Sequence, residues 1–419
     1  MLPPVLPWVR AIEALYYTTA RRVTFVLREG CDLLMSVDSG HWSIYKNAVD
    51  VIPHQELERR LAGSETLRVK LGIDPTAPDI HLGFAVVLKE LRAFQDLGHT
   101  AVLVIGDYTA RVGDPSGRSK ERPILSTEQI EENTRTYLEQ AYIILDPGRT
   151  EVRRNSEWLA PLTMADLIRL TRATTVARIL ERDDFARRYA ARAPITLTEL
   201  LYPLMQAYDS VAVQADVELG GTDQLYNLLA GRTVMEAYGL EPQVVLTTPL
   251  LLSWDGAKMS SSVGNNIPLT APPEEQFGRA MRIPDEQLAE WYRLVLERDV
   301  PAGEPMEAKL ALAHAIAARS HGEEAAVAAA AHFTRVVREG QAPDEVSDAA
   351  LPAGDPVHLP ALLASAFGLS TSEARRLIAQ GGVKLDGTAV TELDLPRGSL
   401  VDATLQAGKR RFARLRDTG

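Results

Sequence analysis

The feature that most constrains this chain is a strand, a helix and a second strand in direct succession. Residues 67–74 alternate apolar and polar side chains, which is typical of a strand. Residues 81–98 repeat apolar side chains at helical spacing and end on Gly98, a residue that suits a helix C-terminus. Residues 100–107 form a second apolar run. This order requires parallel strands joined by a crossover helix, so we predict an α/β fold with a Rossmann-like parallel sheet.

The rest of the chain predicts further units. Helices are expected at about residues 126–145 and 163–190, and another buried strand at residues 243–252. A break at residues 341–358 precedes two short helices, a hairpin with an Asp-Gly turn and a basic, alternating tail. We therefore expect an N-terminal extension, a Rossmann-like domain, a helical domain rich in Ala and Glu, and a small α+β domain, over residues 1–46, 47–271, 272–345 and 355–419.

Composition excludes several classes of protein. At 419 residues the chain is too long for one compact core, and 46% hydrophobic with 24% charged residues is an ordinary globular balance. No apolar stretch is long enough for a membrane span. Cys31 is the only cysteine, so no intramolecular disulfide or cysteine-built zinc site is possible, and we expect a cytoplasmic protein.

Charge is distributed unevenly along the chain. The formal net charge is -11, yet residues 355–419 hold nine Lys and Arg against seven Asp and Glu. Nucleic acid stays a possible partner, because local basic patches and not the net charge decide such binding.

The first residues resemble no part of the remaining chain. Residues 1–46 show neither helical nor strand periodicity, and Met35 offers a second start. We expect residues 1–34 to lie outside the Rossmann-like domain. A start assigned too far upstream explains them as well as a genuine extension does.

A segment at the first strand–helix junction suggests phosphate binding. Residues 72–84 place free backbone N–H groups and the positive end of a helix dipole at one point, where an anion is favoured. Thr76 and His81 can donate to phosphate oxygens, and Gly83 lets a nucleotide approach the backbone. A capped turn with a chance histidine explains His81 and Gly83 alone, but not the whole segment.

Four further segments follow in order. Asp114, in residues 113–122, could hold an ammonium group, and the basic residues after it, including Arg122, could attract phosphates. Tyr202, Gln206 and Asp209 share one helix face, which suggests a pocket with directed hydrogen bonds. Each segment alone could be a surface turn or a satisfied polar stripe.

The last two segments bear on a nucleotide. Asp223, in the turn at residues 220–224, is placed to accept ribose hydroxyls. Lys258, followed by three serines after Met259, could close over a triphosphate and neutralise a leaving pyrophosphate. A capped turn and a serine-rich linker are the alternatives. Five such segments in this order favour a nucleotide-dependent enzyme.

These segments resemble the class I aminoacyl-tRNA synthetases, and within them the bacterial tyrosyl-tRNA synthetases. Residues 81–84 resemble the HIGH motif and residues 258–262 the KMSKS motif, while residues 113–117 and 202–209 resemble segments that separate tyrosyl from tryptophanyl enzymes. The resemblance covers residues 50–419, including a ribosomal-protein-type RNA-binding domain at the end.

The resemblance implies ATP with Mg²⁺, L-tyrosine and tRNA(Tyr) as ligands, a homodimer, and no metal held by the protein itself. Catalysis would fall to Thr76, His81 and Lys258. ATP would contact Gly83, Phe84, Arg122, Asp223 and Ser261. Tyrosine and its adenylate would contact Asp74, Asp114, Tyr202, Gln206, Asp209 and Gln224. RNA would contact Arg375, Arg376, Lys384, Lys409, Arg410 and Arg414.

Three positions depart from the family pattern. Phe84 replaces the second histidine of HIGH, Ser261 replaces the second lysine of KMSKS, and Lys70-Leu71 stands where many members carry a tyrosine that touches the substrate phenol. Two other functions therefore stay open: a different nucleotidyltransferase with an HxGH-type site, and a non-catalytic RNA-binding paralogue.

Overall fold

The computed structural model describes residues 17–19, 22–26, 34–38, 41–115, 125–261, 263–339, 346–408 and 411–417. The chain divides into two compact units. The first comprises Met1–Thr270 with Arg293–Glu297, and the second comprises Ala271–Tyr292 with Arg298–Gly419.

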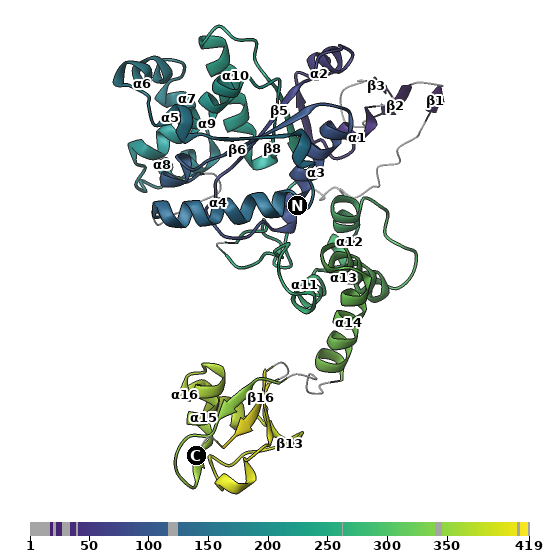
Figure 1. The fold of residues 1–419 in the computed structure, drawn as a ribbon, viewed down its shortest axis with the longest axis vertical. Coiled ribbons are helices and arrows are strands. Elements are labelled where there is room, and N and C mark those ends of the chain that lie inside the picture. The colour runs from purple at the N-terminus through teal and green to yellow at the C-terminus, as the bar shows by residue number, and fades with distance from the viewer. Residues whose placement is uncertain are drawn as a thin grey trace, which may run out of the picture. The chain divides into compact units, whose positions relative to one another are not determined.

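A six-stranded sheet forms the centre of the first unit (Figure 1). Its strands, in spatial order, are β4 (Asp50–Ile52), β9 (Val244–Thr248), β8 (Val217–Gly221), β5 (Arg68–Ile73), β6 (Thr100–Ile105) and β7 (Thr150–Arg154). Only the edge strand β4 is antiparallel to its neighbour. The five parallel strands follow the order 3-2-1-4-5 of the doubly wound Rossmann fold, in which the winding reverses between β5 and β8. The predicted parallel α/β class is confirmed.

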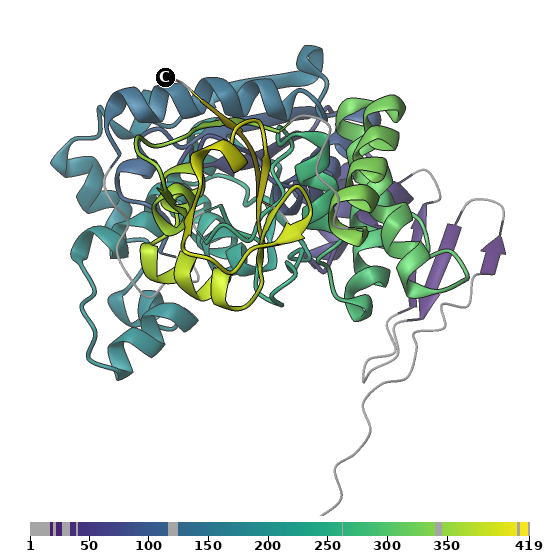
Figure 2. The same ribbon diagram turned by 90° about the horizontal axis from the view of Figure 1, so that it is seen from below.

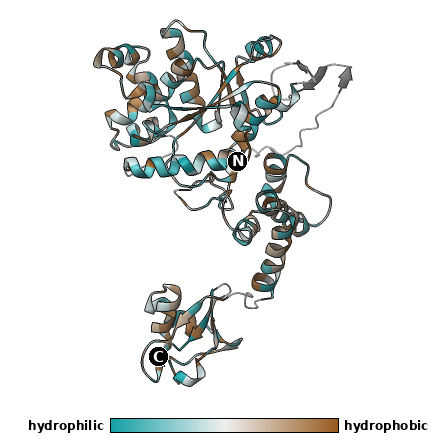
Figure 3. Cartoon of the chain, viewed as in Figure 1, coloured by the Kyte–Doolittle hydropathy of each residue, from teal (hydrophilic) through white to brown (hydrophobic). Residues whose placement is uncertain are grey.

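Helices α3 (Leu82–Asp96), α9 (Leu197–Val213) and α10 (Leu225–Ala237) pack against this sheet. The remaining helices of the unit are α1 (Trp42–Tyr45), α2 (His54–Leu61), α4 (Thr127–Ala141), α5 (Ser156–Leu159), α6 (Met164–Thr171), α7 (Val176–Leu180) and α8 (Asp183–Ala190). Helix α4 is largely hydrophilic, as Figure 3 shows. Strand β6 is buried from Ala101 to Ile105, which explains its unbroken apolar sequence.

The single helix expected at residues 163–190 is three short ones. Thr163 and Thr175 each accept a hydrogen bond from a backbone N–H three residues later, and each therefore begins a new helix. Strand β7 was not expected, because its sequence TEVRR is mostly charged.

The second unit contains α11 (Pro273–Ala280), α12 (Leu288–Trp291), α13 (Pro305–His321) and α14 (Glu323–Phe333). Alanines Ala313, Ala317, Ala326 and Ala329 are buried where α13 meets α14. Their small side chains let the two helices approach closely, which accounts for the alanine-rich sequence.

The C-terminal sheet has the strand order β10 (Asp348–Ala350), β16 (Arg411–Arg416), β15 (Thr404–Ala407), β12 (Val383–Leu385) and β13 (Thr388–Ala389). Helices α15 (Leu359–Phe367) and α16 (Thr371–Ala379) lie together beside this sheet (Figures 1 and 2) and share its apolar core. Strand β11 (Val357–His358) pairs with β14 (Asp394–Leu395). Asp386 and Gly387 both have positive φ, as the Asp-Gly hairpin turn requires. The sheet begins at Asp348, ahead of the expected start at residue 355.

Strands β1 (Tyr17–Thr19), β2 (Arg22–Val26) and β3 (Leu34–Asp38) form an antiparallel sheet of their own. No ladder joins them to another strand in the described part of the chain. Among the helices described, none combines the length and apolar character needed to cross a bilayer.

Candidate active site

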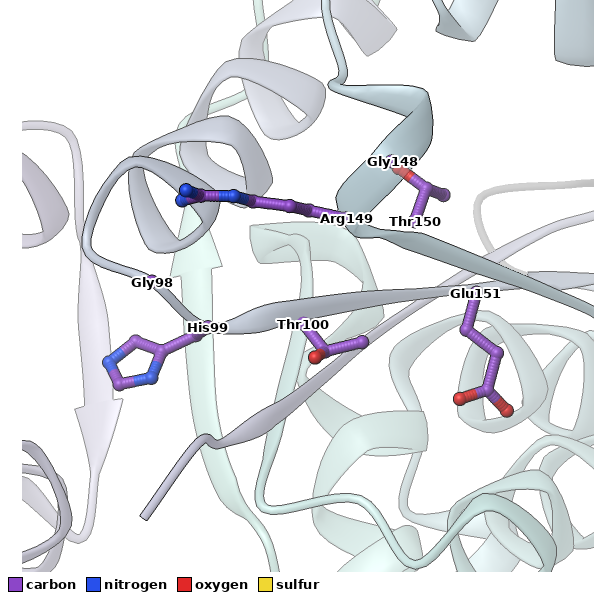
Figure 4. A pocket seen from close by; sticks show the side chains of 7 residues that line it. All are labelled: Gly98, His99, Thr100, Gly148, Arg149, Thr150 and Glu151. Atoms are coloured by element: carbon purple, nitrogen blue, oxygen red, sulfur yellow. The ribbon is translucent and has the colours of Figure 1, made fainter. Parts of the chain in front are cut away.

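The predicted site residues gather where the strand order reverses. Asp74 directly follows β5, and Gly221 ends β8, so both lie at the carboxyl edge of the sheet beside the switch point. Open parallel sheets bind their ligands in the crevice at this edge. A polar depression lined by Gly98–Thr100 and Gly148–Glu151 lies instead at the amino ends of β6 and β7 (Figure 4).

Asp74 is the centre of one hydrogen-bond network. The Tyr202 hydroxyl donates to Asp74 Oδ2 at 2.8 Å, and the Thr109 hydroxyl donates to Oδ1 at 2.7 Å. A Cβ at Gly106 would lie 2.0 Å from Asp74 Oδ1, so only glycine fits there. Burial and the Asp74 carboxylate raise the pKa of Tyr202, which keeps its hydroxyl protonated and a donor.

Asp209 is buried beneath the same network. Trp158 Nε1 donates to Asp209 Oδ1 at 2.8 Å, and Asn155 Nδ2 donates to Oδ2 at 3.4 Å. Asn155 also donates to the Thr109 hydroxyl at 2.9 Å, which links Asp209 to the Asp74 network. Burial raises the pKa of Asp209 to about 7, against the opposing effects of Lys70, Trp158 and Asn155.

A second network joins the other polar residues. Gln224 Nε2 donates to Asp114 Oδ2 at 2.8 Å. Asn227 Nδ2 donates to Gln224 Oε1 at 3.0 Å and to Gln206 Oε1 at 3.1 Å, while Arg182 Nη1 donates to Asn227 Oδ1 at 3.1 Å. Three predicted residues, Asp114, Gln206 and Gln224, are thus connected through an asparagine that the sequence did not single out.

His81 begins helix α3. Its Nδ1 accepts the backbone N–H of Phe84 at 3.3 Å, so the imidazole caps the helix. Burial, with the charge of Lys258 adding to it, lowers the pKa of His81 to about 4. The ring is therefore neutral at pH 7 and acts through hydrogen bonds. Thr76 lies in the same loop, where its N–H donates to the Asp74 carbonyl at 2.7 Å.

The loop that carries Lys258 is hydrogen-bonded to the segment around His81. Leu82 N–H donates to the Ile267 carbonyl at 3.0 Å, and Leu269 N–H donates to the Ile80 carbonyl at 2.9 Å. A Cβ at Gly83 would lie 3.4 Å from Met259 Cβ, so the loop passes directly over this glycine.

Lys258 forms an ion pair with Asp223 across the site. The Ser261 hydroxyl accepts a hydrogen bond from Asn266 Nδ2 at 3.1 Å. The two segments that resemble HIGH and KMSKS therefore meet, with the single lysine at the point of contact. In the described part of the chain, no three His, Cys, Asp or Glu side chains gather as a metal site.

The remaining predicted residues lie elsewhere. Arg375 and Arg376 are exposed on α16, Arg414 is exposed on β16, and Lys384 is half-buried on β12, so all four belong to the C-terminal sheet domain. Arg122, Lys409 and Arg410 lie outside the described residues.

Sequence reasoning missed several side chains of the site, namely Thr109, Asn155, Trp158 and Asn227, and it gave Lys70 no role. Asn155 directly follows β7 and Thr109 follows β6, so the edge rule for parallel strands would have found both once β7 was recognised.

Comparison with known proteins gives consistent results. The sequence profile of the class I tRNA synthetases (W and Y) matches residues 62–344, and that of the S4 domain matches residues 359–395. A tyrosine–tRNA ligase of Thermotoga maritima is 48% identical over 385 residues, covering 88% of this chain and 95% of that protein. One from Oleidesulfovibrio alaskensis is 46% identical over 397 residues, covering 91% and 99%.

Solved structures show the same fold. The tyrosyl-tRNA synthetase of Archaeoglobus fulgidus, solved with L-tyrosine, has a TM-score of 0.57 and 23% identity, covering 70% of this chain and 98% of its own.

Proposed function

The chain belongs to the tyrosine–tRNA ligase family of class I tRNA synthetases, and on this premise we propose how its own residues perform the reaction. Tyrosine is activated with ATP to tyrosyl-adenylate, and the tyrosyl group then passes to the 3′ end of tRNA(Tyr). The observation that carries the proposal is the buried network in which Asp74, Tyr202 and Asp209 meet at the switch point.

The two ends of tyrosine meet different groups in this proposal. Asp114, Tyr202 and Gln206 take the ammonium group, since carboxylate and amide oxygens accept its N–H donors. Asp209 accepts the phenol hydroxyl at the closed end of the pocket, where Trp158 and Asn155 hold its carboxylate. A buried acceptor that phenylalanine leaves unpaired penalises the wrong substrate. Asp74 and Gln224 fix these groups from behind.

The nucleotide half of the site works by position and charge. The tyrosine carboxylate is already ionised and pyrophosphate leaves readily, so adenylation needs alignment and charge stabilisation more than a strong base. Thr76 and the neutral His81 donate to phosphate oxygens at the α3 N-terminus. Lys258 leaves Asp223 for the departing pyrophosphate, and Asp223 is then free for the ribose.

ATP fits the remaining contacts. Gly83 and Phe84 lie beneath the nucleotide, while Ser261 and Arg122 add a hydroxyl and a charge near its phosphates. Mg²⁺ would arrive with ATP, and no step of this proposal runs through it.

The S4 domain holds the tRNA in this proposal. Arg375, Arg376 and Arg414 are exposed there and Lys384 is half-buried, so their cations are available to phosphates, which position RNA without reading its sequence. Lys409 and Arg410 belong to the same basic tail. A cytoplasmic location follows from the tRNA substrate.

A homodimer completes the proposal. Large apolar side chains are exposed on α6, α7 and the start of α9, where Met164 is 71%, Val176 61% and Leu197 81% exposed. An exposed apolar patch commonly marks a protein interface, and we propose these side chains as part of such a patch. Sedimentation equilibrium of the whole chain tests this step, with twice the 45.9 kDa monomer mass expected.

Pyrophosphate exchange into ATP tests the central proposal. The wild-type protein should catalyse exchange that depends on tyrosine and barely responds to phenylalanine. Asp209→Ala should erode that preference by about 1.5–3 kcal/mol, the worth of one hydrogen bond to a charged group. A protein without tyrosine-dependent exchange would instead be the RNA-binding paralogue or another nucleotidyltransferase. Unchanged selectivity in the variant would move the phenol contact away from Asp209.

A further inference from the structure

Lys70 has an unusual place for a lysine. It lies in β5, the strand next to the switch point, and its side chain is 0% exposed. Ammonium groups are rarely buried completely, because removal from water is costly unless every donor is paired. A retained buried lysine therefore needs an explanation.

Three acceptors saturate the Lys70 ammonium. Its Nζ donates to the Gln206 carbonyl at 3.0 Å, to the Ser210 hydroxyl at 2.8 Å and to Glu218 Oε1 at 2.8 Å. Lys70 has no donor left for a substrate phenol. Its side chain faces helix α9 and the neighbouring strand instead.

Glu218 completes the arrangement from the neighbouring strand. It is opposite Lys70 in the ladder of β5 and β8, and its Oε2 accepts from the Ser210 hydroxyl at 2.8 Å and Gln243 Nε2 at 2.7 Å. A Cβ at Gly231 would lie 2.3 Å from Gln243 Nε2 and 3.0 Å from Glu218 Oε2, so this glycine leaves the space that the ion pair needs.

The two α9 residues that Lys70 binds flank Asp209 and include a substrate residue. Gln206 is one turn before Ser210, and Asp209 precedes Ser210 directly. The groups that face Asp209 are Lys70 from β5, Glu218 from β8, Trp158 from α5, Asn155 after β7, and Tyr202 from its own helix. Lys70 is the only cation of that set.

We propose that Lys70 is a positioning residue for tyrosine selection: its hydrogen bonds to the Gln206 carbonyl and the Ser210 hydroxyl tie α9 to the sheet and fix the segment that carries Asp209, the acceptor of the substrate phenol. Lys70 does not contact the substrate itself; it acts through Asp209 and through its hydrogen bond to the Gln206 carbonyl. This inference rests on the proposed function.

The charged residues near Asp209 determine in which direction its pKa should move in each variant. Lys70 lowers the pKa of Asp209, while Glu218 raises it by a smaller effect. Removing both charges should therefore favour protonated Asp209, and removing Glu218 alone should favour ionised Asp209. A merely structural ion pair predicts no such opposite pair of changes.

The experiment compares three proteins: a double variant that carries both Lys70→Met and Glu218→Gln, the single variant Glu218→Gln, and wild type. The readout is the ratio of kcat/KM for tyrosine to that for phenylalanine in pyrophosphate exchange between pH 6 and pH 9. Titrations that affect both substrates, including those of ATP, cancel in this ratio. In wild type the ratio should fall as pH decreases through about 7, where Asp209 takes up its proton.

The double variant should move this midpoint to higher pH, and the ratio at pH 7 should fall roughly tenfold for each pH unit by which the midpoint rises. Glu218→Gln alone should move it to lower pH. Because this variant leaves the buried Lys70 without its counter-charge, the double variant, which removes both charges, keeps the test available if the single variant fails to fold. Arg188→Met with Glu199→Gln is the matched control, because it removes another buried ion pair at the start of the same helix. Its midpoint should equal that of wild type.

Ratio curves that superimpose on wild type, or equal losses for both substrates at every pH, would overturn the role of Lys70. Failure of the proposed function would look different, since wild type would then lack tyrosine-dependent exchange. The inference about Lys70 would be refuted, and the proposed function kept, if wild type and Asp209→Ala behave as proposed while the Lys70 variant keeps the wild-type ratio curve.

Discussion

Asp209 should be held in place at a cost in stability, and this cost can be measured. Its pKa is about 7 in the folded chain against 3.8 for the ordinary group, because burial disfavours the charged form. Below pH 3.8 both states are protonated and the carboxyl group costs nothing. The penalty grows between pH 3.8 and 7 and is complete above 7. At about 1.4 kcal/mol for each pH unit between these values, it reaches about 4 kcal/mol.

Asp209→Asn removes this penalty while keeping the side-chain shape. We expect the variant to be more stable than wild type at pH 8.5, with the gain falling by about 1.4 kcal/mol for each pH unit below 7. Trp158 can still donate to the new amide oxygen, whereas the contact with Asn155 is lost and subtracts about 1 kcal/mol. Thermal unfolding of both proteins at pH 8.5 and pH 6 measures the difference.

Glu65→Gln, at an exposed acid of the same unit, serves as the control for a general charge effect. A stability difference between Asp209→Asn and wild type that is the same at both pH values would refute the reasoning, because a buried group with a raised pKa must respond to pH.

Two other predictions concern the chemistry and the RNA. Lys258→Ala should raise the activation free energy of adenylation by about 3–4 kcal/mol and change tyrosine binding little, which single-turnover kinetics would measure. Lys309→Ala, at an ion-paired lysine of the second unit, is the control and should leave the rate unchanged. An unchanged rate in Lys258→Ala would mean that the loop is not catalytic. A chain ending at Glu339, ahead of β10, should keep pyrophosphate exchange and lose most tRNA charging, and in the whole chain tRNA affinity should fall steeply with salt; full charging by the shortened chain would contradict a tRNA-binding role.

Periodicity was sufficient for the parallel class of the sheet, although strand β8, whose sequence VELGG ends in two glycines, was not predicted. The apolar runs of β5, β6 and β9 and the helical spacing of α3 are all direct records of burial, so each was predictable. Strand β7 was not, because it lies at the sheet edge and its half-buried residues are mostly charged. Missing β7 also hid Asn155 and Trp158, whose positions depend on where that strand ends.

Lys70 shows a different limit of sequence reasoning. The alternation at residues 67–73 predicted a strand, but it gave Lys70 neither a partner nor a role. Both faces of this parallel sheet are covered, and the lysine faces α9 and Glu218. Glu218, its ion-pair partner, is 148 residues away in the chain, so no local sequence pattern could have predicted the pair.

These buried polar groups explain why selectivity and stability oppose each other here. A pocket that must recognise a phenol hydroxyl needs a fixed acceptor away from water, and burial drives such an acceptor toward its protonated form. A nearby cation counters that tendency, but it must itself be buried and paired, which accounts for Glu218, Ser210 and the space left by Gly231. Each of these buried groups would destabilise the fold by itself, and each is compensated by the group that pairs with it. Replacing Lys70 and Glu218 by apolar residues of similar size could therefore leave the fold intact, and the loss would appear in the choice between tyrosine and phenylalanine.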